Sequence, residues 1–119
     1  MEWDHPFDVG MTGLIGFSSG YHAMLGCDTL VMLGTNFLYR NFYPTDAKVV
    51  RSHIRPEAIG KRTLVDLGLV GDFKSAIGAL LPRLRRRGDR SFLKRARAHY
   101  TNACIGLDEL AYLRPATCA

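Results

Sequence analysis

Three short apolar segments limit the possible folds of this chain more than any other feature of its sequence. Each is followed by residues that end a strand or a helix. Residues 29–33 form a continuous apolar run closed by a glycine, the pattern of a strand buried on both faces of a parallel sheet. Residues 47–54 form a second run, and Arg55-Pro56 stops it because the residue before a proline is driven out of the helical region. Residues 65–70 form the third run. The sequence therefore predicts three strands.

Three other segments carry helical signals. Residues 21–25 read as a short helix that stops near a glycine. Asp72 is the expected N-cap of a second helix, which Pro82 ends or kinks, and Asp89 is the expected N-cap of a last, long helix. The apolar stripes of these two helices are Phe73, Ala76, Ile77, Leu80, Leu81 and Leu84 in the first, and Phe92, Ala96, Tyr100, Ala103, Leu107 and Leu110 in the second.

The order of these elements indicates an α/β fold with a parallel sheet. A doubly wound sheet usually begins with a strand that leads into a glycine loop. The residues before the glycine-spaced stretch 10–20 hold only Trp3 and Phe7 as large apolar groups, so no good first strand is present. We therefore expect a partial doubly wound, Rossmann-like sheet of about three strands, followed by a long basic helix. The expected boundary divides an α/β part, 1–87, from a helical segment, 88–119.

Length and cysteine usage indicate the class of protein. A chain of 119 residues suits one domain, and it holds no run of ~18 apolar residues that could span a membrane. Its acidic start shows no secretory signal. Cys27, Cys104 and Cys118 are distant from one another, which fits a reducing cytoplasm better than a disulfide framework or a zinc site. Cys27 is expected to be a small buried hydrophobe.

Positive charge is concentrated in one segment. Residues 1–82 carry seven Lys or Arg against eight Asp or Glu, whereas residues 83–119 carry nine against three. Eight of those nine lie between Arg83 and Arg97. Such a cluster attracts the phosphates of nucleic acid or of anionic lipid. We expect a solvated, Arg-rich helix face, with the anionic inner face of a membrane as the alternative partner. No base-reading motif is present, so no nucleic-acid partner is expected.

Two segments and one strand end could hold a ligand. The glycines of 10–20 precede a helix and let backbone N–H groups approach a phosphate, although tight helix packing explains them equally well. Residues 35–39 follow the carboxyl end of the first strand, where open α/β sheets bind ligands. Ser52 and His53 end the second strand, where a ribose site would favour a carboxylate. A structural role is the alternative reading of His53.

No catalytic or metal-ligating group is expected. Ser18 and Ser19 have no base that the sequence makes visible, and no nucleophile elbow, P-loop or zinc-protease motif occurs. The four histidines share no metal-ligand spacing; they are His5, His22, His53 and His99.

Several unusual strings occur in order along the chain. They are FDVGMTGLIGFSSG at 7–20, DTLVMLGT at 28–35, FYPTDAK at 42–48, IRPEAIG at 54–60, DLGLVGD at 66–72, RSFLK at 90–94 and GLDEL at 106–110. Their order resembles the central domain of the thiamine-diphosphate-dependent pyruvate oxidases, and more closely that of the quinone-linked pyruvate dehydrogenases. The resemblance covers roughly residues 3–111, and 112–119 look unrelated.

The resemblance implies a fold and a set of cofactors. In that family the first and third domains hold thiamine diphosphate and Mg²⁺ between the subunits of a homo-oligomer, and in the oxidase branch the central domain binds FAD by its ADP part. The resemblance implies that this chain is the second half of a central domain plus the start of a connector. The family's catalytic glutamate, metal motif and membrane-binding terminus would then lie outside it, on partner chains or missing domains.

The family's FAD contacts fall on three places in this chain. They are Thr12, Gly13, Leu14 and Ile15; then Thr35, Asn36, Phe37, Leu38 and Tyr39; and finally His53, where the family has Asp. A buried apolar position of the family has also become Ser52. Losing the carboxylate acceptor is expected to cost ~1–3 kcal/mol of binding free energy, so FAD affinity should be weakened.

Three functional readings follow. The first is a piece of an FAD- and thiamine-diphosphate-dependent, pyruvate-oxidising enzyme that is inactive alone, without its own thiamine diphosphate or Mg²⁺. The second is a non-functional remnant, whose unpaired strand edge predicts aggregation. The third is a small module that binds anionic membrane or nucleic acid through Arg83–Arg97. The Ser52 and His53 changes favour the second over a working flavin site, and the length of the match disfavours the third.

Overall fold

The computed structural model describes the backbone of residues 5–112 and the side chains of residues 5–106. By its internal contacts the chain divides into two compact units. One unit is Met24–Gly88, and the other joins Met1–Ala23 to Asp89–Ala119. The expectations placed on Trp3, Leu107, Leu110 and Cys118 lie outside the described side chains.

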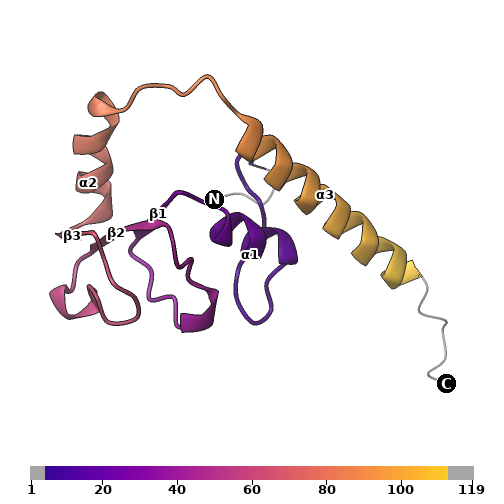
Figure 1. The fold of residues 1–119 in the computed structure, drawn as a ribbon, viewed down its shortest axis with the longest axis horizontal. Helices are drawn as coiled ribbons and strands as arrows, with labels where there is room; N and C mark the ends of the chain where they lie inside the picture. Colours follow the sequence, from indigo (N-terminus) through magenta and orange to yellow (C-terminus); the bar gives the residue numbers. More distant parts are fainter. Residues whose placement is uncertain (1–4, 113–119) are drawn as a thin grey trace. The chain divides into compact units, whose positions relative to one another are not determined.

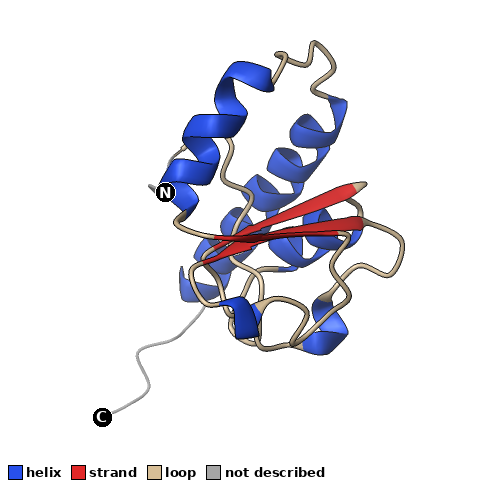
Figure 2. Cartoon of the chain, turned by 90° about the vertical axis from the view of Figure 1, so that its left-hand side faces the viewer, coloured by secondary structure: helices blue, strands red, loops and turns tan. Residues whose placement is uncertain are grey.

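The unit Met24–Gly88 contains a three-stranded parallel sheet, so the α/β prediction is confirmed (Figure 2). Its strands are β1 (Thr29–Leu33), β2 (Lys48–His53) and β3 (Leu67–Val70), in the order β1-β2-β3. The register pairs Val31 with Val50 and Val50 with Leu67. The connections between the strands contain the short 3₁₀ turns η1 (Arg40–Phe42) and η2 (Pro56–Ala58) in place of crossover helices.

The prediction that the first strand is buried on both faces is wrong. Only Met32 of β1 is buried, and Val31 and Leu33 are 50% and 42% exposed. Side chains alternate between the two faces of a strand, and the exposed ones, Thr29, Val31 and Leu33, all lie on one face, so the described residues cover only the Met32 face of β1. The central strand β2 is the buried one, although its buried residues include the polar side chains of Arg51, Ser52 and His53.

The hydrophobic core of this unit is small. Met32, Tyr43 and Val49 form a buried cluster, against which Leu30, Phe37 and Val65 pack. The loop between β1 and β2 supplies Tyr43, whose hydroxyl donates a hydrogen bond to the carbonyl oxygen of Phe37 at 2.9 Å. The rings of Phe37 and Tyr43 also meet edge to face, with centroids 5.5 Å apart. The aromatic loop is therefore part of the core.

The burial of Tyr43 gives the first testable prediction, a loss of stability at high pH. Burial raises the pKa of the Tyr43 phenol, and the nearby charges of Arg51 and Arg62 lower it to a lesser extent. A folded-state pKa above the unfolded value stabilises the fold below about pH 10, and this stabilisation is lost as the pH rises through the folded pKa. The hydroxyl must also be protonated to donate to Phe37.

We expect wild type to lose stability above pH 10 more steeply than Tyr43→Phe. At neutral pH, Tyr43→Phe should cost about 1 kcal/mol, the net contribution of one hydrogen bond. Urea unfolding across this pH range measures both effects. Parallel pH profiles for the two proteins would show that Tyr43 does not titrate in this way.

The helix that follows β3 begins as predicted. Helix α2 (Phe73–Leu80) has Asp72 as its N-cap, and the carboxylate of Asp72 accepts a hydrogen bond from the Ser75 N–H at 3.0 Å. The turn η3 (Leu81–Arg83), which contains Pro82, follows the helix directly. The predicted apolar stripe is not buried, however: the exposed fractions of Phe73, Leu80, Leu81 and Leu84 are 49%, 46%, 61% and 58%. In the described residues this stripe has too little opposing surface to cover it.

The other unit packs the glycine-spaced stretch against the long C-terminal helix. Helix α1 (Ser18–Leu25) begins three residues earlier than predicted, and α3 spans Ser91–Tyr112 (Figure 1). Within this unit, Phe17 meets Tyr100 edge to face at 5.7 Å, and the Arg97 guanidinium donates to the carbonyl oxygen of Asp8 at 2.6 Å. The prediction that Asp89 is the N-cap is wrong by one residue: α3 begins at Ser91, so Arg90 occupies the N-cap position, and the Asp89 carboxylate accepts a hydrogen bond from the Ser91 N–H.

The basic cluster does not lie on one helix face, which corrects that expectation. Arg83 ends η3, and Arg85, Arg86, Arg87 and Arg90 precede the first residue of α3. Proline and glycine explain this, because Pro82 stops the earlier helix and Gly88 interrupts the segment before the next. None of the helices found in residues 5–112 combines the length and hydropathy needed to cross a bilayer.

Candidate functional site

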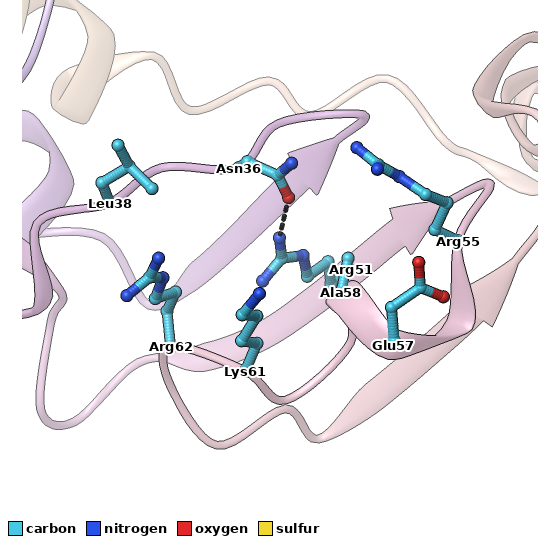
Figure 3. Close-up of a pocket in the computed structure, with 8 residues that line it drawn as sticks. All are labelled: Asn36, Leu38, Arg51, Arg55, Glu57, Ala58, Lys61 and Arg62. Atoms are coloured by element: carbon cyan, nitrogen blue, oxygen red, sulfur yellow. Dashed lines mark hydrogen bonds between the residues drawn. The ribbon is translucent and has the colours of Figure 1, made fainter.

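A polar pocket of about 280 Å³ lies in the unit Met24–Gly88, among the loops that follow β1 and β2 (Figure 3). The loop after β1 contributes Asn36 and Leu38. Strand β2 contributes Arg51, and the segment after it contributes the other lining residues, which are Arg55, Glu57, Ala58, Lys61 and Arg62. Loops at the carboxyl ends of parallel strands are the usual place for ligands in open α/β sheets.

A buried arginine lies at the base of this pocket. Arg51 is 1% exposed, and its Nη2 donates to the carbonyl oxygen of Thr35 at 2.8 Å and to Oδ1 of Asn36 at 3.2 Å. Both acceptors are uncharged. Its Nε and Nη1 atoms have no hydrogen-bond partner among the described residues. A buried guanidinium with unused donors is costly unless an acceptor completes it.

Short-range contacts hold the loops around the pocket. Gly34 has a φ of +63°, a left-handed conformation that favours glycine, and it turns the chain from β1 into the 35–39 segment. Its N–H donates to the Ser52 carbonyl at 2.9 Å and extends the β1–β2 ladder by one bond. On the far side, the guanidinium of Arg40 donates to the carbonyl of Lys61 at 3.2 Å.

The pocket is strongly positive. Four of its lining side chains are cationic and only Glu57 is acidic. In Figure 3, Lys61 lies next to Arg51. Arg62 lies on one side of this pair, and Arg55 and Glu57 lie on the other side. Like charges gathered around a concave surface raise the local concentration of anions. The site can therefore bind an anion, and the described residues hold no cluster of three or more side chains suited to a metal ion.

The predicted segment 35–39 contributes to this pocket in part. Asn36 and Leu38 line it, and Thr35 holds Arg51 through its carbonyl oxygen. Phe37 points into the core, and its ring meets that of Tyr39 edge to face at 5.4 Å.

His53 lies at the end of β2, as predicted, but it is 5% exposed and does not line the pocket. Its Nδ1 accepts a hydrogen bond from the backbone N–H of Arg55 at 3.0 Å, which fixes the start of the next turn. Ser52 is also buried, and its hydroxyl oxygen has no partner within the described residues. The expectation that serine occupies a buried position is therefore confirmed.

The predicted segment Thr12, Gly13, Leu14 and Ile15 belongs to the other unit. It forms the loop before α1, in which the Phe17 N–H donates to the Met11 carbonyl at 2.7 Å. Leu14 and Ile15 are 76% and 84% exposed. Their role as cofactor contacts stays a prediction.

Sequence reasoning missed the cationic residues of the pocket. Arg51 interrupts the apolar run of its strand, and a charged residue at a buried strand position is the signal that could have identified it. Lys61 and Arg62 carry no such signal. A second missed pair is Ser18 Oγ and His99 Nε2, 3.2 Å apart in the unit that holds α3. They are 81 residues apart in the sequence, so spacing could not reveal them.

Comparisons with known proteins identify relatives of most of this chain. Residues 1–80 match the family model described as thiamine pyrophosphate enzyme, central domain. The chain is 63% identical over 110 residues to an uncharacterized 42.6 kDa protein in the isoamylase 3′ region of Pseudomonas amyloderamosa. It is 40% identical over 95 residues to the "Putative thiamine pyrophosphate-containing protein YdaP" of Bacillus subtilis, and 36% over 86 residues to an acetolactate synthase of Mycobacterium leprae.

These matches cover most of this chain but little of each relative. They include 92%, 80% and 68% of this chain, respectively. The chain spans only 28%, 17% and 14% of the three relatives.

Proposed function

This chain belongs to the thiamine pyrophosphate enzyme family, as a member of its central-domain class, and we propose that it supplies part of an FAD site in such an enzyme. The enzyme we propose oxidises pyruvate, as the sequence resemblance to pyruvate oxidases and quinone-linked pyruvate dehydrogenases implies. The chain alone is not expected to carry out the reaction.

The observation that carries the proposal is the pocket beside residues 35–39. Two of the five residues expected to contact FAD, Asn36 and Leu38, line a positive pocket where parallel strands end. The ADP part of FAD carries two phosphates, so it is suited to a cationic environment. The buried donors of Arg51 that lack partners fit an anionic ligand as well.

Each predicted segment has a role in this proposal. The resemblance assigns cofactor contacts to the backbone of Thr12–Ile15 in one unit and to Thr35–Tyr39 in the other. His53 occupies the position where the resemblance places the family's carboxylate near the ribose, although its own ring is buried and does not line the pocket. FAD would supply electron-accepting chemistry in the assembled enzyme. Chains that carry the other family domains would supply thiamine diphosphate and Mg²⁺.

The relatives also include acetolactate synthases, such as the one from Mycobacterium leprae. An acetolactate synthase-like assembly is therefore the second candidate. The alternative of a membrane- or nucleic-acid-binding basic helix has less support, because most of the cluster lies outside α3.

Bound flavin tests the proposal directly. The purified chain is mixed with FAD, desalted, and its flavin absorbance is measured per chain. A near-stoichiometric signal supports the proposal, and riboflavin, which lacks the ADP part, serves as the control ligand. A folded, monodisperse chain that retains no FAD contradicts it, and an aggregated product favours the remnant.

His53→Asp gives a second prediction about the same site. Restoring a carboxylate acceptor should tighten FAD binding by roughly 5-fold to 150-fold, which corresponds to about 1–3 kcal/mol. Asp can still accept the backbone N–H of Arg55, so the turn after β2 should survive. Titration of intrinsic fluorescence with FAD measures the affinity.

The matched control is His53→Asn, which keeps an acceptor for the Arg55 N–H but adds no charge. Equal affinities of the Asp and Asn variants would remove position 53 from the flavin site. Because the control probes the turn separately, a folding defect can be told apart from a loss of contact.

A further inference from the structure

Two histidines face each other in the unit that joins the first residues of the chain to α3. His22 lies on α1 and His99 lies on α3, and their ring centroids are 5.2 Å apart with an interplanar angle of 31°. His22 is exposed and His99 is half-buried, so an ion from solvent can reach the pair. Neutral imidazole is the commonest metal ligand among protein side chains. The pair is therefore a candidate for one shared ion.

The distance between the two rings fits a shared ion. Zinc binds histidine nitrogens at about 2.0–2.1 Å and prefers tetrahedral geometry. Two imidazoles bound to one ion at that length and angle have ring centroids about 5 Å apart. The observed separation of 5.2 Å agrees with this value, so the helices need no rearrangement. Ring pairs without a metal also occur at about 4.5–7 Å, and the side chain beside the pair adds a second indication.

That side chain is the hydroxyl of Ser18, whose Oγ lies 3.2 Å from Nε2 of His99. Ser18 and His22 are four residues apart on α1, so they share the helix face that meets His99. A metal-ligating histidine usually donates its other ring N–H to an oxygen, which fixes the tautomer and the orientation of the ring. With Nε2–H donating to Ser18, the lone pair of His99 is on Nδ1, where it is available to a metal ion.

Contacts next to the pair hold α1 against α3. Phe17 and Tyr100, the chain neighbours of Ser18 and His99, meet edge to face with ring centroids 5.7 Å apart. The guanidinium of Arg97 donates to the carbonyl oxygen of the segment before α1 at Asp8, 2.6 Å away. These contacts position the two histidines before any ion binds, and preorganised ligands lower the entropic cost of binding.

We propose that His22 and His99 bind one divalent ion of the late first-row transition metals, such as Zn²⁺, with Ser18 as the residue that orients His99. Imidazole ligands suit zinc, copper and nickel, whereas Mg²⁺ prefers oxygen ligands. Two protein ligands are fewer than the four of a closed structural zinc site, so water fills the other positions. This inference does not depend on flavin binding, and it concerns neither the pocket beside Arg51 nor the family's Mg²⁺.

Calorimetric titration of the full chain with Zn²⁺, in the presence of excess Mg²⁺, tests the proposal. We expect one ion per chain. His22→Gln and His99→Gln should each weaken zinc binding by about tenfold or more, since even the loss of an outer-shell partner has an effect of this size. Ser18→Ala should weaken it by roughly threefold to tenfold, the effect of one lost hydrogen bond. His5→Gln is the matched control: it removes an exposed histidine of the same unit and should leave the affinity unchanged.

Two further measurements identify the ligands. Thiolates also bind zinc and the chain has three cysteines, so the chain is loaded with Co²⁺ and its absorption spectrum is recorded. We expect ligand-field bands without the near-ultraviolet band of a cobalt–thiolate bond. Excess Zn²⁺ should also raise the unfolding temperature of wild type and of His5→Gln, because the ion joins α1 to α3 only in the folded chain. It should not do so for His22→Gln or His99→Gln.

Several outcomes overturn the metal site. They are the absence of saturable zinc binding by a folded chain, displacement of zinc by Mg²⁺, a cobalt–thiolate band, and a loss of affinity in His5→Gln equal to that in the pair. Half an ion per chain, together with dimers in analytical ultracentrifugation, would assign the histidines to a bridge between two copies. Because His22 is exposed, His22→Gln keeps the test valid even where His99→Gln fails to fold. A chain that binds zinc but no FAD would contradict the proposed function alone.

Discussion

Gly16→Ala is expected to lower the free energy of unfolding of the unit that holds α1 and α3 by about 3 kcal/mol. A Cβ at position 16 would lie 2.3 Å from the carbonyl oxygen of Met11, 2.7 Å from the nitrogen of Gly13 and 2.8 Å from the carbonyl carbon of Thr12. All three are backbone atoms, so no side-chain rotation can relieve the clash. The loop is closed by the Phe17–Met11 hydrogen bond of 2.7 Å, and opening it would break that bond.

Gly106→Ala is the matched control for this change. Gly106 lies in α3 of the same unit, and a Cβ there would meet no atom within 4 Å. This substitution should stabilise the helix by up to about 1 kcal/mol, because alanine has the higher helix propensity. Urea unfolding followed by circular dichroism, with amide hydrogen exchange at Phe17, compares the variants. Equal stability of Gly16→Ala and wild type would show that the loop is not packed in this way.

Met32→Ala is expected to cost about 2–5 kcal/mol in the unit that holds the sheet. Met32 is 4% exposed and is one of three buried residues in the core cluster, together with Tyr43 and Val49. Truncation removes apolar burial and leaves a cavity in a core that has few other members. Since whole domains are stable by only about 5–15 kcal/mol, this loss should remove much of the cooperative transition.

Val31→Ala, at the neighbouring position of β1, is the control for the effect of strand propensity. Val31 is 50% exposed, so its truncation should cost about 1 kcal/mol or less. Thermal unfolding monitored by tyrosine fluorescence measures both variants. A similar cost for the two substitutions would mean that β1 is not buried on the Met32 side.

Strand positions could be predicted well from local signals. The run at 29–33 coincides with β1, and the runs at 47–54 and 65–70 contain β2 and β3. Asp72 caps α2, as predicted. A short acceptor side chain before a helix bonds a free backbone N–H of the first turn, and this local interaction does not depend on the rest of the fold. Burial could not be predicted in the same way. Apart from Thr29, residues 29–33 are apolar, yet one face of β1 is exposed, because the elements that pack against the sheet decide which face is covered.

Only the site residues that come directly after a strand in the sequence could be predicted. Asn36 and Leu38 were found because they come directly after a strand, and such positions collect at one edge of a parallel sheet. Lys61 and Arg62 were missed because their place in the pocket depends on how the loop after η2 returns toward β3. The Ser18–His99 pair was missed for the same reason, since helices α1 and α3 bring these residues together across 81 positions.

The sequence by itself determined the elements, the α/β class and the family, because caps, prolines, apolar runs and ordered strings act over a few residues each. Tertiary structure decided which strand is buried and where the charges meet. The basic cluster 83–97, the most conspicuous charge in the sequence, is mostly loop and solvent-facing. Arg51 is one of sixteen Lys and Arg residues in the sequence. Its attraction for anions comes from the low-dielectric interior that surrounds it and from the three cations that the loops place beside it.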